Sequence, residues 1–348
     1  MHKFRIGNTA IGHDEPAFVI AEIGQNHQGS LTIAKELFVA AAKAGASAVK
    51  LQKRDPRAYT DAFNGSSYDG PNSFGKTYSE HRKKLEFGAA EYRTLKAFAE
   101  HLGLAFFATP FDTYSVEFLM ELDIEAYKIA SGDISNYPLI ELTAKSGKPL
   151  IISTGGADLA EVSAAFEVAN TQNQHIALLQ CTSTYPTPDD EINVSVVKSL
   201  GESFPDAVVG LSSHSLSLLP SVMAFTLGAR IFEYHFTLDR SWKGSDHKIS
   251  LQPREFKQLV DSLRFAQQAL GDGKKSPRES ELRQLGKTRK SLVAARDLTK
   301  GSVLGPNDFA IKVPGGGLYP SRLPELIGRQ LCKDLAADDA ITFDAVEM

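Results

Sequence analysis

Cysteine is scarce in this sequence: Cys181 and Cys332 are the only two among 348 residues, and they lie far apart. Two distant cysteines form no disulfide framework, so we expect a reducing compartment. Long hydrophobic runs are lacking as well, since no stretch approaches the roughly 18 uninterrupted apolar residues that span a bilayer. The N-terminus also lacks the apolar segment of a secretory signal. We therefore expect a cytoplasmic protein without a membrane partner.

An excess of either charge is also absent. The 38 basic and 42 acidic residues leave a formal net charge of −4. This balance provides no field for nucleic acid or for an anionic membrane. A hydrophobic content of 42% and a charged content of 23% are typical of a globular protein. Any phosphate that the protein binds must therefore be held by a local cluster of side chains.

Eight short apolar runs are present, each bounded by turn residues. Nearly continuous apolarity indicates burial on both faces, as parallel strands covered by helices require. The predicted strands are Ala17–Gly24, Ala46–Lys53, Leu104–Thr109, Ala126–Ser131, Pro149–Thr154, Ile176–Ser183, Ala207–His214 and Ala229–Thr237.

Amphipathic helical patterns lie between these runs. Leu31–Ala44 follows Ser30, a plausible N-cap, and stops at Gly45. Further predicted helices are Glu91–His101, Val116–Leu122 after Thr113, Leu159–Ala169 after Asp158, and Pro253–Leu270. Strand–helix alternation repeated eight times predicts a (β/α)₈ TIM barrel, although an open doubly wound sheet shares the local pattern.

The sequence pattern changes near the end of the chain. A barrel takes about 250 residues, which leaves room for a small second module. Residues 271–275 break the helical pattern, and Ser276–Glu279 predicts the start of a short helix that ends near Gly286. Short β-like runs then alternate with glycine and proline turns. We predict a barrel domain at 1–272, a linker with a short helix at 273–290, and a small β-rich domain at 291–348.

Polar residues end nearly every predicted strand. In a (β/α)₈ barrel these ends converge on one mouth, where the active site lies, whereas an open sheet would keep its outer strands apart. Polar residues also punctuate strand ends without function, but that explains one or two of them and not eight strands in eight. The strand-end residues are Glu22, Lys50, Gln52, Thr109, Lys128, Ser131, Ser153, Ser183, Ser212, His214, Glu233 and His235.

Two histidines end the seventh and eighth predicted strands. A single histidine on an apolar strand is more often a satisfied core residue than a metal ligand. Because neighbouring strands carry His214 and His235, however, both imidazoles can point at one ion. Imidazole suits Mn, Fe, Co or Zn. Such an ion would polarise a carbonyl group as a Lewis acid.

Lysines occupy the second and fourth predicted strands, at Lys50 and Lys128. A lysine inside a barrel is costly unless it pairs with an anion or serves as a neutral nucleophile. The first alternative predicts a phosphate or carboxylate ligand, and the second predicts a Schiff-base aldolase. In the segment after the eighth strand, Asp246 could accept hydrogen bonds from sugar hydroxyls and Lys243 could meet a second anion, although such a loop is by itself more often structural.

The connection over residues 54–90 exceeds the usual length of a strand-to-helix loop. It carries several aromatic residues and then the basic residues Lys76, His81, Arg82, Lys83 and Lys84. Long loops on the catalytic side of a barrel usually face the substrate. The alternative is a packed surface loop with a solvated run of charge, and the sequence leaves both open.

Seven ordered motifs together resemble the sialic acid synthase family. The final module, with Val313-Pro314-Gly315, is similar to the family's antifreeze-like (SAF) domain, so the resemblance covers nearly the whole chain. The motifs are Ala21–Gly29 (AEIGQNHQG), Lys128–Asp133 (KIASGD), Ile152–Gly155 (ISTG), Cys181–Pro186 (CTSTYP), Gly210–His214 (GLSSH), Glu233–His235 (EYH) and Gly244–His247 (GSDH).

The resemblance implies condensation of phosphoenolpyruvate with an open-chain N-acylmannosamine, which releases phosphate and forms a nine-carbon 2-keto acid. It implies that His214 and His235 bind a divalent metal, Mn²⁺ first, with Mg²⁺ or Co²⁺ as alternatives. Glu22, and second Glu233, are the candidates for stabilising the cationic intermediate or directing water. The implied phosphoenolpyruvate ligands are Lys50, Thr109, Lys128, Ser131, Ser153, Ser183, Tyr185 and Ser212, and the implied sugar ligands are Gln52, Asp133, Tyr185 and Asp246.

The resemblance further implies a homodimer in which the C-terminal module of each chain caps the partner's barrel. Two positions depart from many bacterial members, which carry Asn in place of Ser183 and Arg in place of Val313. That Arg supplies the cap's contact to the sugar, so its absence puts the usual contact in doubt. With Gly75–His81 and Trp242–His247, these departures resemble the branch that acts on the sugar 6-phosphate. Lys76, Arg82 and Lys243 are then candidate ligands of the second phosphate.

Several alternatives remain at this point. A related nonulosonic acid, of the legionaminic, pseudaminic or KDN type, would need the same barrel and cap. A Schiff-base pyruvate aldolase would use Lys128 or Lys50 covalently. A phosphoenolpyruvate aldol enzyme that makes an eight-carbon or aromatic-pathway acid shares the barrel but is not expected to carry this module. A purely binding or ice-binding protein is disfavoured by eight polar strand ends.

Overall fold

The computed structural model of the chain describes residues 3–347. The chain divides into two compact units, Met1–Gly271 and Asp272–Met348, which are described in turn. Among the described residues, none of the helices combines the length and the apolarity that a membrane crossing requires.

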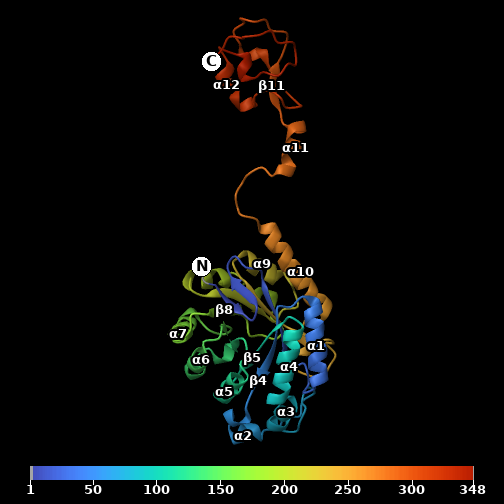
Figure 1. Cartoon of the computed structure of the whole chain (residues 1–348), viewed down its shortest axis with the longest axis vertical. Helices are drawn as coiled ribbons and strands as arrows, with labels where there is room; N and C mark the ends of the chain where they lie inside the picture. Colours follow the sequence, from blue (N-terminus) through green and yellow to red (C-terminus); the bar gives the residue numbers. More distant parts are fainter. Residues whose placement is uncertain (1–2, 348) are drawn as a thin grey trace. The chain divides into compact units, whose positions relative to one another are not determined.

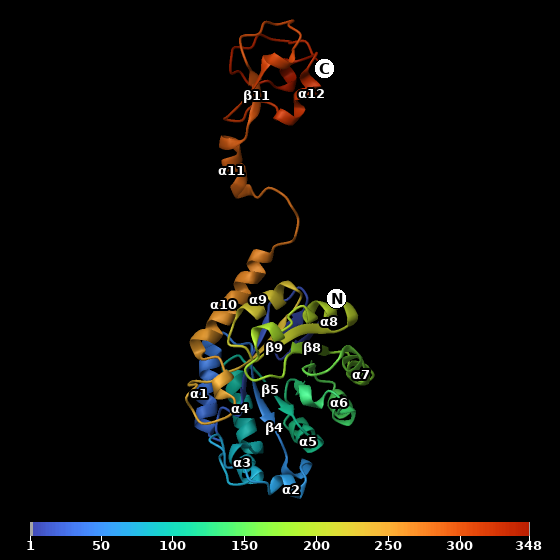
Figure 2. The same ribbon diagram turned by 180° about the vertical axis from the view of Figure 1, so that it is seen from behind.

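The first unit is a closed barrel of eight parallel strands (Figures 1 and 2). Every strand lies within two residues of its predicted bounds, so the predicted (β/α)₈ barrel is confirmed. The strands follow the chain order around the barrel, and β10 closes it by pairing with β3. They are β3 (Phe18–Gly24), β4 (Ala48–Lys53), β5 (Ala105–Pro110), β6 (Tyr127–Ile129), β7 (Leu150–Ser153), β8 (Ile176–Cys181), β9 (Val208–Ser213) and β10 (Ile231–His235).

Helices follow the strands and cover the outside of the barrel (Figure 1). They are α1 (Leu31–Ala44), α4 (Ala89–His101), α5 (Thr113–Glu121), α6 (Tyr137–Ala144), α7 (Leu159–Asn170), α8 (Val196–Ser203), α9 (Leu219–Thr226) and α10 (Pro253–Leu270). The first unit also contains the short 3₁₀ turns η1 (Pro56–Ala58), η2 (Ser131–Asp133), η3 (Asp189–Glu191) and η4 (His247–Ile249). The second unit contains η5 (Pro306–Asp308), η6 (Pro320–Arg322) and η7 (Phe343–Ala345).

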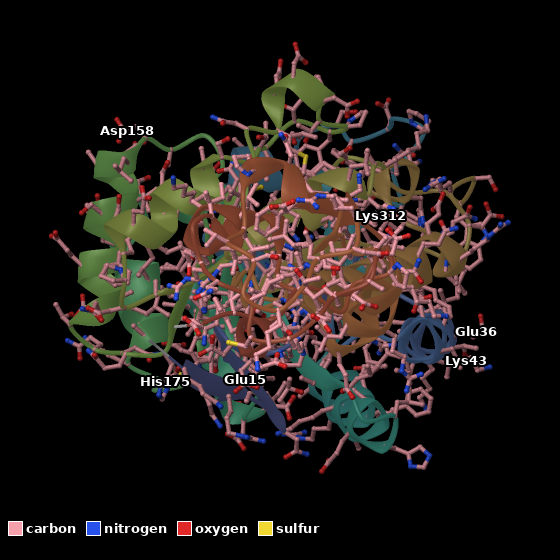
Figure 3. The ribbon with its side chains drawn as sticks, turned by 90° about the horizontal axis from the view of Figure 1, so that it is seen from above. Glu15, Glu36, Lys43, Asp158, His175 and Lys312 are labelled. Atoms are coloured by element: carbon pink, nitrogen blue, oxygen red, sulfur yellow. The ribbon has the colours of Figure 1, made fainter. Side chains whose placement is uncertain are left out.

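The first of these helices shows why the local sequence forms them. The side chain of Ser30 accepts a hydrogen bond from the backbone N–H of Ile33, and Gly45 takes a left-handed conformation with φ 89°. Both predicted ends of α1 are therefore confirmed. One face of α1 is buried against the barrel, whereas Glu36 and Lys43 point outward (Figure 3). The alternation of apolar and polar residues thus fixes which face is buried.

An antiparallel hairpin precedes the barrel and was not predicted from the sequence. It consists of β1 (Lys3–Ile6) and β2 (Thr9–Gly12). Its apolar side chains, Phe4, Ile6 and Ile11, are buried in the barrel core. The backbone oxygen of His13 then accepts a hydrogen bond from Arg230, directly before β10. The hairpin therefore lies at the N-terminal ends of the strands, opposite the mouth where the predicted site lies.

The long connection between β4 and α4 is folded, with η1, α2 (Asp61–Asn64) and α3 (Tyr78–Leu85) inside it. Its aromatic side chains form a cluster around Tyr78, whose ring centre lies 5.2 Å from that of Tyr59 and 4.5 Å from that of Phe63. Of the consecutive basic residues on α3, Lys83 and Lys84 are exposed. For those two lysines, the interpretation as a packed surface loop with solvated charges is correct.

The second unit has a core of its own, formed by residues that include Leu292, Leu304 and Ile341. Its elements are α11 (Glu279–Thr288), β11 (Ser291–Ala294), β12 (Phe309–Lys312) and α12 (Leu323–Leu326), with β11 and β12 antiparallel. The start of α11 was predicted wrongly. Ser276 was the predicted N-cap, but the N-cap is Arg278, whose backbone N–H donates a hydrogen bond to Glu281.

Candidate active site

A cavity of about 340 Å³ opens at the C-terminal ends of the barrel strands. It brings together most of the residues that the sequence singled out. Those that line it are Glu22, Lys50, Gln52, Arg82, Thr109, Lys128, Ser131, Ser153, Ser183, Tyr185, Ser212, His214, Glu233, His235 and Asp246. They come from all eight strands or the loops that follow them, because closure of the barrel directs every strand end to the same mouth.

Three of the predicted residues do not line the cavity. Asp133, in η2, is partly buried and its carboxylate accepts a hydrogen bond from the Asn136 amide. Lys76 and Lys243 are exposed, and the ammonium group of Lys243 lies 5.1 Å from the centre of the Phe74 ring. Lys76, Arg82 and Lys243 were the candidate ligands of a sugar phosphate, and of these three only Arg82 lines the cavity.

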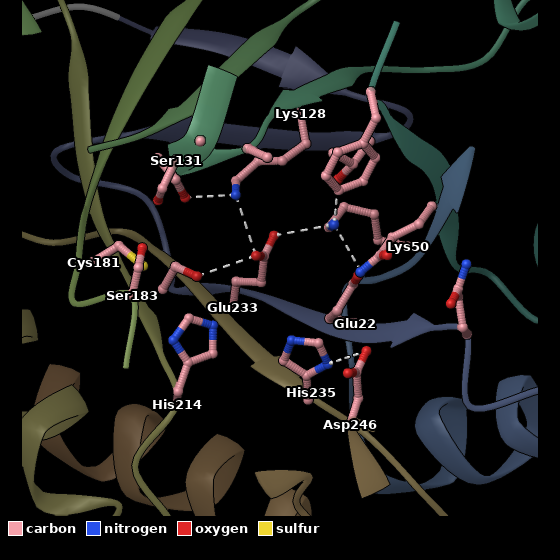
Figure 4. Close-up of a pocket in the computed structure, with 18 of the residues that line it drawn as sticks. Glu22, Lys50, Lys128, Ser131, Cys181, Ser183, His214, Glu233, His235 and Asp246 are labelled. Carbon is pink, nitrogen blue, oxygen red and sulfur yellow. Dashed lines mark hydrogen bonds and ion pairs between the residues drawn. The ribbon is translucent and has the colours of Figure 1, made fainter. Parts of the chain in front are cut away.

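Lys50 is the centre of the first buried ion pair. Its ammonium nitrogen lies 2.7 Å from Oε2 of Glu22 and donates a hydrogen bond of 2.6 Å to Oγ1 of Thr109 (Figure 4). The side chains of Lys50 and Glu22 are only 3% and 2% exposed. Because solvent does not screen this pair, the charges of both groups act strongly on anything that enters the cavity.

Lys128 forms the second buried ion pair, with Glu233. Its ammonium nitrogen lies 3.3 Å from Oε1 of Glu233 and donates to Oγ of Ser153 at 2.6 Å. The hydroxyl of Ser212 also donates to Glu233, at 3.1 Å. Burial raises the pKa of Glu233, but the ammonium groups of Lys128 and then Lys50 outweigh burial and bring the pKa to about 2. Glu233 is therefore a carboxylate at neutral pH.

A cradle of small residues lies beside these lysines. The hydroxyl of Ser131 accepts a hydrogen bond from the backbone N–H of Gly155 at 3.0 Å. A Cβ at Gly155 would lie 2.3 Å from Oγ of Ser183 and 2.8 Å from Oγ of Ser131. Only glycine lets the backbone approach both hydroxyls at this position. The hydroxyls thus remain beside the ammonium groups, an arrangement suited to anionic oxygens.

His214 and His235 lie side by side at the mouth, at the ends of the neighbouring strands β9 and β10, with ring centres 5.6 Å apart (Figure 4). Nδ1 of His214 contacts the backbone oxygen of Thr182 at 3.0 Å. A carbonyl oxygen only accepts, so Nδ1 carries the proton and Nε2 keeps a free lone pair. Burial, followed by the nearby His235, lowers the pKa of His214 to about 4. The imidazole is therefore neutral at physiological pH.

These two side chains fit a divalent metal ion. Nδ1 of His235 is buried without a hydrogen-bond partner, and it lies 3.7 Å from Oδ2 of Asp246. Neutral imidazoles are the donors that a Mn²⁺- or Zn²⁺-like ion accepts. Across residues 3–347 the structure shows no group of three or more His, Cys, Asp or Glu placed for metal binding. Water or substrate oxygens would therefore complete the coordination of an ion held here.

Polar groups for a neutral ligand lie beside the histidines. Nε2 of Gln52 donates to Oε1 of Glu22 at 2.9 Å. The ring of Tyr185 lies 4.0 Å from that of His214, and Tyr185 remains 59% exposed. Asp246 belongs to the loop after β10, and its carboxylate accepts a hydrogen bond from Ser245 at 2.6 Å. Of these three residues Tyr185 is exposed, whereas Gln52 and Asp246 are half-buried.

Some cavity residues were not predicted from the sequence. They are Gln25, Arg54, Phe111, Ala130, Gly132, Cys181 and Ser245. Two of them could have been found from strand periodicity. Lys50, Gln52 and Arg54 alternate along the end of β4 and the residue after it, and Phe111 follows Thr109 by two positions. Because alternate residues of a strand point to the same face, the pattern that selected Lys50 extends to Arg54.

Two family models match this chain. The NeuB family model matches residues 37–275, and the SAF domain model matches residues 289–347. N-acetylneuraminate-9-phosphate synthase of Homo sapiens is 37% identical, over 97% of this chain and 94% of that protein. N,N'-diacetyllegionaminic acid synthase of Legionella pneumophila is 36% identical, over 97% of this chain and 96% of that protein.

A solved structure is similar as well. The N-acetylneuraminic acid (sialic acid) synthetase of Leptospira borgpetersenii, crystallised with citrate, is 34% identical to this chain. The match covers 82% of this chain and 95% of that one, with a TM-score of 0.70. The predicted SAF domain is thus confirmed, as is the predicted barrel.

Proposed function

The chain belongs to the NeuB family, and on that premise we propose that it condenses phosphoenolpyruvate with N-acetylmannosamine or its 6-phosphate. The products are a nine-carbon 2-keto acid, a sialic acid or its 9-phosphate, and inorganic phosphate. The observation that carries this proposal is one cavity lined by two neighbouring imidazoles, His214 and His235, and by two buried, ion-paired lysines. The first pair suits a metal and an aldehyde oxygen, and the second suits an anion.

Phosphoenolpyruvate would bind over Lys50 and Lys128. Its carboxylate and phosphate oxygens would take hydrogen bonds from the two ammonium groups and from the cradle hydroxyls. The hydroxyl ligands would be Thr109, Ser131, Ser153, Ser183, Tyr185 and Ser212. Because the ion pairs already hold the lysines in place, binding orders few side chains.

The sugar would bind between the phosphoenolpyruvate and the open side of the cavity, with its hydroxyls on Gln52, Tyr185 and Asp246. His214 and His235 would hold the metal ion, Mn²⁺ first. A divalent ion bound there would polarise the aldehyde carbonyl as a Lewis acid. The neutral state of His214 is compatible with this role, because only an unprotonated nitrogen coordinates a metal.

The bond changes assign roles to the two glutamates. C3 of phosphoenolpyruvate forms the new bond to the aldehyde carbon, which leaves positive charge on C2. Water then adds to C2 and gives up its protons. Cleavage of the bond between C2 and the phosphate oxygen releases phosphate, and the oxygen of the water becomes that of the keto group. Glu233 is a fixed carboxylate between two ammonium groups, so we assign it to holding the lysines. Glu22, which Gln52 and Lys50 orient, is our candidate for stabilising the charge at C2 or directing the water.

A Schiff-base aldolase is disfavoured by the same ion pairs. A lysine that attacks a carbonyl must be neutral. Lys50 and Lys128 are instead each held in an ion pair with a buried carboxylate, at 2.7 Å and 3.3 Å. A related nonulosonic acid as the product remains the main alternative, since a relative named above makes N,N'-diacetyllegionaminic acid. The homodimer with an exchanged cap remains a prediction, as does the consequence of Val313.

The test is release of phosphate from phosphoenolpyruvate in the presence of a panel of hexosamines and their 6-phosphates, with and without Mn²⁺. We expect metal-dependent release with an N-acylmannosamine or its 6-phosphate and a nine-carbon 2-keto acid by mass spectrometry. Borohydride trapping with pyruvate should yield no adduct. Release of no phosphate with any sugar, or a borohydride adduct on Lys50 or Lys128, would contradict the proposal.

A further inference from the structure

Two arginines, Arg54 and Arg82, line the same cavity as the lysines. Arg54 follows β4 directly, and Arg82 lies on α3, in the folded connection between β4 and α4. The reaction described above assigns no role to Arg54. Arg54 nevertheless lines the cavity together with Arg82, close enough for the two like charges to repel each other. This pairing calls for a ligand that neutralises both.

Arg54 is held in place by neutral groups. Nη1 of Arg54 donates a hydrogen bond of 2.7 Å to Oε1 of Gln52. Its guanidinium carbon lies 3.5 Å from the centre of the Phe111 ring, a stacking contact. Burial, followed by the nearby positive charge of Arg82, lowers the pKa of Arg54. The guanidinium is thus fixed in position, but its charge is not compensated by these contacts.

Arg82 is also positioned by an aromatic residue. Its Nε donates to the hydroxyl of Tyr78 at 2.9 Å, and its guanidinium carbon lies 5.0 Å from the centre of the Tyr78 ring. Nη1 of Arg82 is buried and has no hydrogen-bond partner. A buried donor without an acceptor is costly. An acceptor supplied by a ligand in the cavity would remove this cost.

Carboxylates do not neutralise these two arginines. Within the described part of the chain, neither guanidinium has a carboxylate oxygen within 4.0 Å. The acidic side chains near Arg54 contact other groups than its guanidinium. Glu86 pairs with the Lys53 ammonium group and accepts from the backbone N–H of Arg54. Asp133 accepts from Asn136, and Asp246 accepts from Ser245. Buried charges are normally paired, so this side of the cavity is suited to an anion from outside the chain.

The position of the pair relative to the reaction centre identifies the anion. Gln52 donates to Glu22 at one end and accepts from Arg54 at the other. A sugar that reacts beside Glu22 would therefore extend along Gln52 toward the arginines, away from its aldehyde carbon. Guanidinium groups bind phosphate through two or more hydrogen bonds, and two of them match a terminal phosphomonoester.

We propose that Arg54 and Arg82 form a phosphate subsite that makes the enzyme select a phosphorylated sugar acceptor over the neutral sugar. This inference rests on the proposed function. Lys76 and Lys243, two of the three candidate ligands of the sugar phosphate, are not part of this subsite, because they are exposed and lie outside the cavity lining. Arg82, the third, remains, and Arg54 joins it.

The experiment compares Arg54→Gln and Arg82→Gln with wild type on N-acetylmannosamine and on its 6-phosphate, with phosphoenolpyruvate saturating. The wild type should prefer the 6-phosphate in kcat/KM. Each variant should lower this preference about tenfold or more, the loss that one charge-assisted hydrogen bond represents. Lys83→Gln, on the exposed side of the same helix, is the matched control and should leave the preference unchanged. Arg82→Lys retains the positive charge but lacks the planar guanidinium, so it tests whether two hydrogen bonds to the phosphate are needed.

Binding of N-acetylmannosamine 6-phosphate, measured by calorimetry, separates this inference from the proposed function. An enzyme that forms product and binds or uses the neutral sugar as well as the 6-phosphate overturns the subsite and leaves the function intact. An inactive enzyme that binds the 6-phosphate, with at least tenfold weaker binding after Arg82→Gln, overturns the function and leaves the subsite. An equal loss on both sugars in the arginine variants also overturns the subsite, provided that their circular dichroism matches that of the wild type.

Discussion

Replacing Glu233 with glutamine would remove the carboxylate that lies between two buried ammonium groups. Glu233 is 3.3 Å from Lys128 and 3.9 Å from Lys50, and it is only 6% exposed. The neutral amide would leave the cluster of two lysines and two glutamates with one uncompensated positive charge. The amide nitrogen would also meet donors where an acceptor is needed. We therefore expect Glu233→Gln to destabilise the barrel.

The magnitude follows from the position of the carboxylate. The pKa of Glu233 is about 2, against 4.5 for a free carboxyl group, and this difference corresponds to about 3 kcal/mol at neutral pH. Breaking a buried ion pair costs about 3–5 kcal/mol, which agrees. Because the pKa in the folded state is the lower one, this stabilisation is present above pH 4.5 and is lost as the pH falls toward 2. The measurement therefore belongs at pH 7.

Urea unfolding followed by tryptophan fluorescence is the assay. The chain has a single tryptophan, Trp242, which belongs to the barrel unit, so the signal reports on the barrel alone. Glu141→Gln is the matched control, because Glu141 pairs with Lys145 on an exposed surface. Loss of this exposed pair should lower the free energy of unfolding by less than about 1 kcal/mol.

A double-mutant cycle with Lys128→Met tests the cause. The double variant retains the Lys50–Glu22 pair and a neutral cluster, so the coupling energy between Glu233 and Lys128 should be at least about 1 kcal/mol. A cost of Glu233→Gln similar to that of the control Glu141→Gln, or strict additivity in the cycle, would refute this account of the cluster.

His27, the Gly155 cradle and the two-histidine site can each be tested separately. Burial holds the pKa of His27 at about 3, so its stabilisation is present above pH 6.5 and declines as the pH falls toward 3. Between pH 7 and pH 5 the wild type should lose about 2 kcal/mol more barrel stability than His27→Gln, and equal losses in urea titrations would contradict this. Gly155→Ala should raise the KM for phosphoenolpyruvate about tenfold by displacing two hydroxyls, and an unchanged KM in steady-state kinetics would argue against the cradle. Dialysis against EDTA should lower phosphate release on the order of 100-fold, with recovery in Mn²⁺, whereas full activity in EDTA would exclude the two-histidine site.

The local pattern of the sequence determined the barrel strands and the covering helices. Burial of a strand on both faces requires a continuous apolar run, and this requirement is visible without any tertiary contact. Caps are equally local, because Ser30 and Gly45 act within a few residues of their own position. The predicted start of α5, at Val116, was too late. The helix begins at Thr113, and Asp112 is its N-cap. The amino-terminal hairpin was missed because its strands are only four residues long.

The partners of the site residues depend on the closed barrel. Lys128 and Glu233 are 105 positions apart in sequence and meet only because β6 and β10 point into one mouth. Sequence periodicity identified both residues as strand ends, but it contains no information on which ends face each other. Asp133 illustrates the limit, since its motif predicted a contact but its carboxylate lies outside the cavity lining.

The sequence by itself determined the fold, the strand ends and the candidate histidines, because these follow from local burial and spacing. Only the tertiary structure decided which basic residues reach the cavity. Arg82 and Lys83 are consecutive on α3, and a rotation of about 100° per residue directs the first inward and the second to solvent. Which face of α3 is inward depends on how the connection packs on the barrel, and that packing involves side chains distant in sequence.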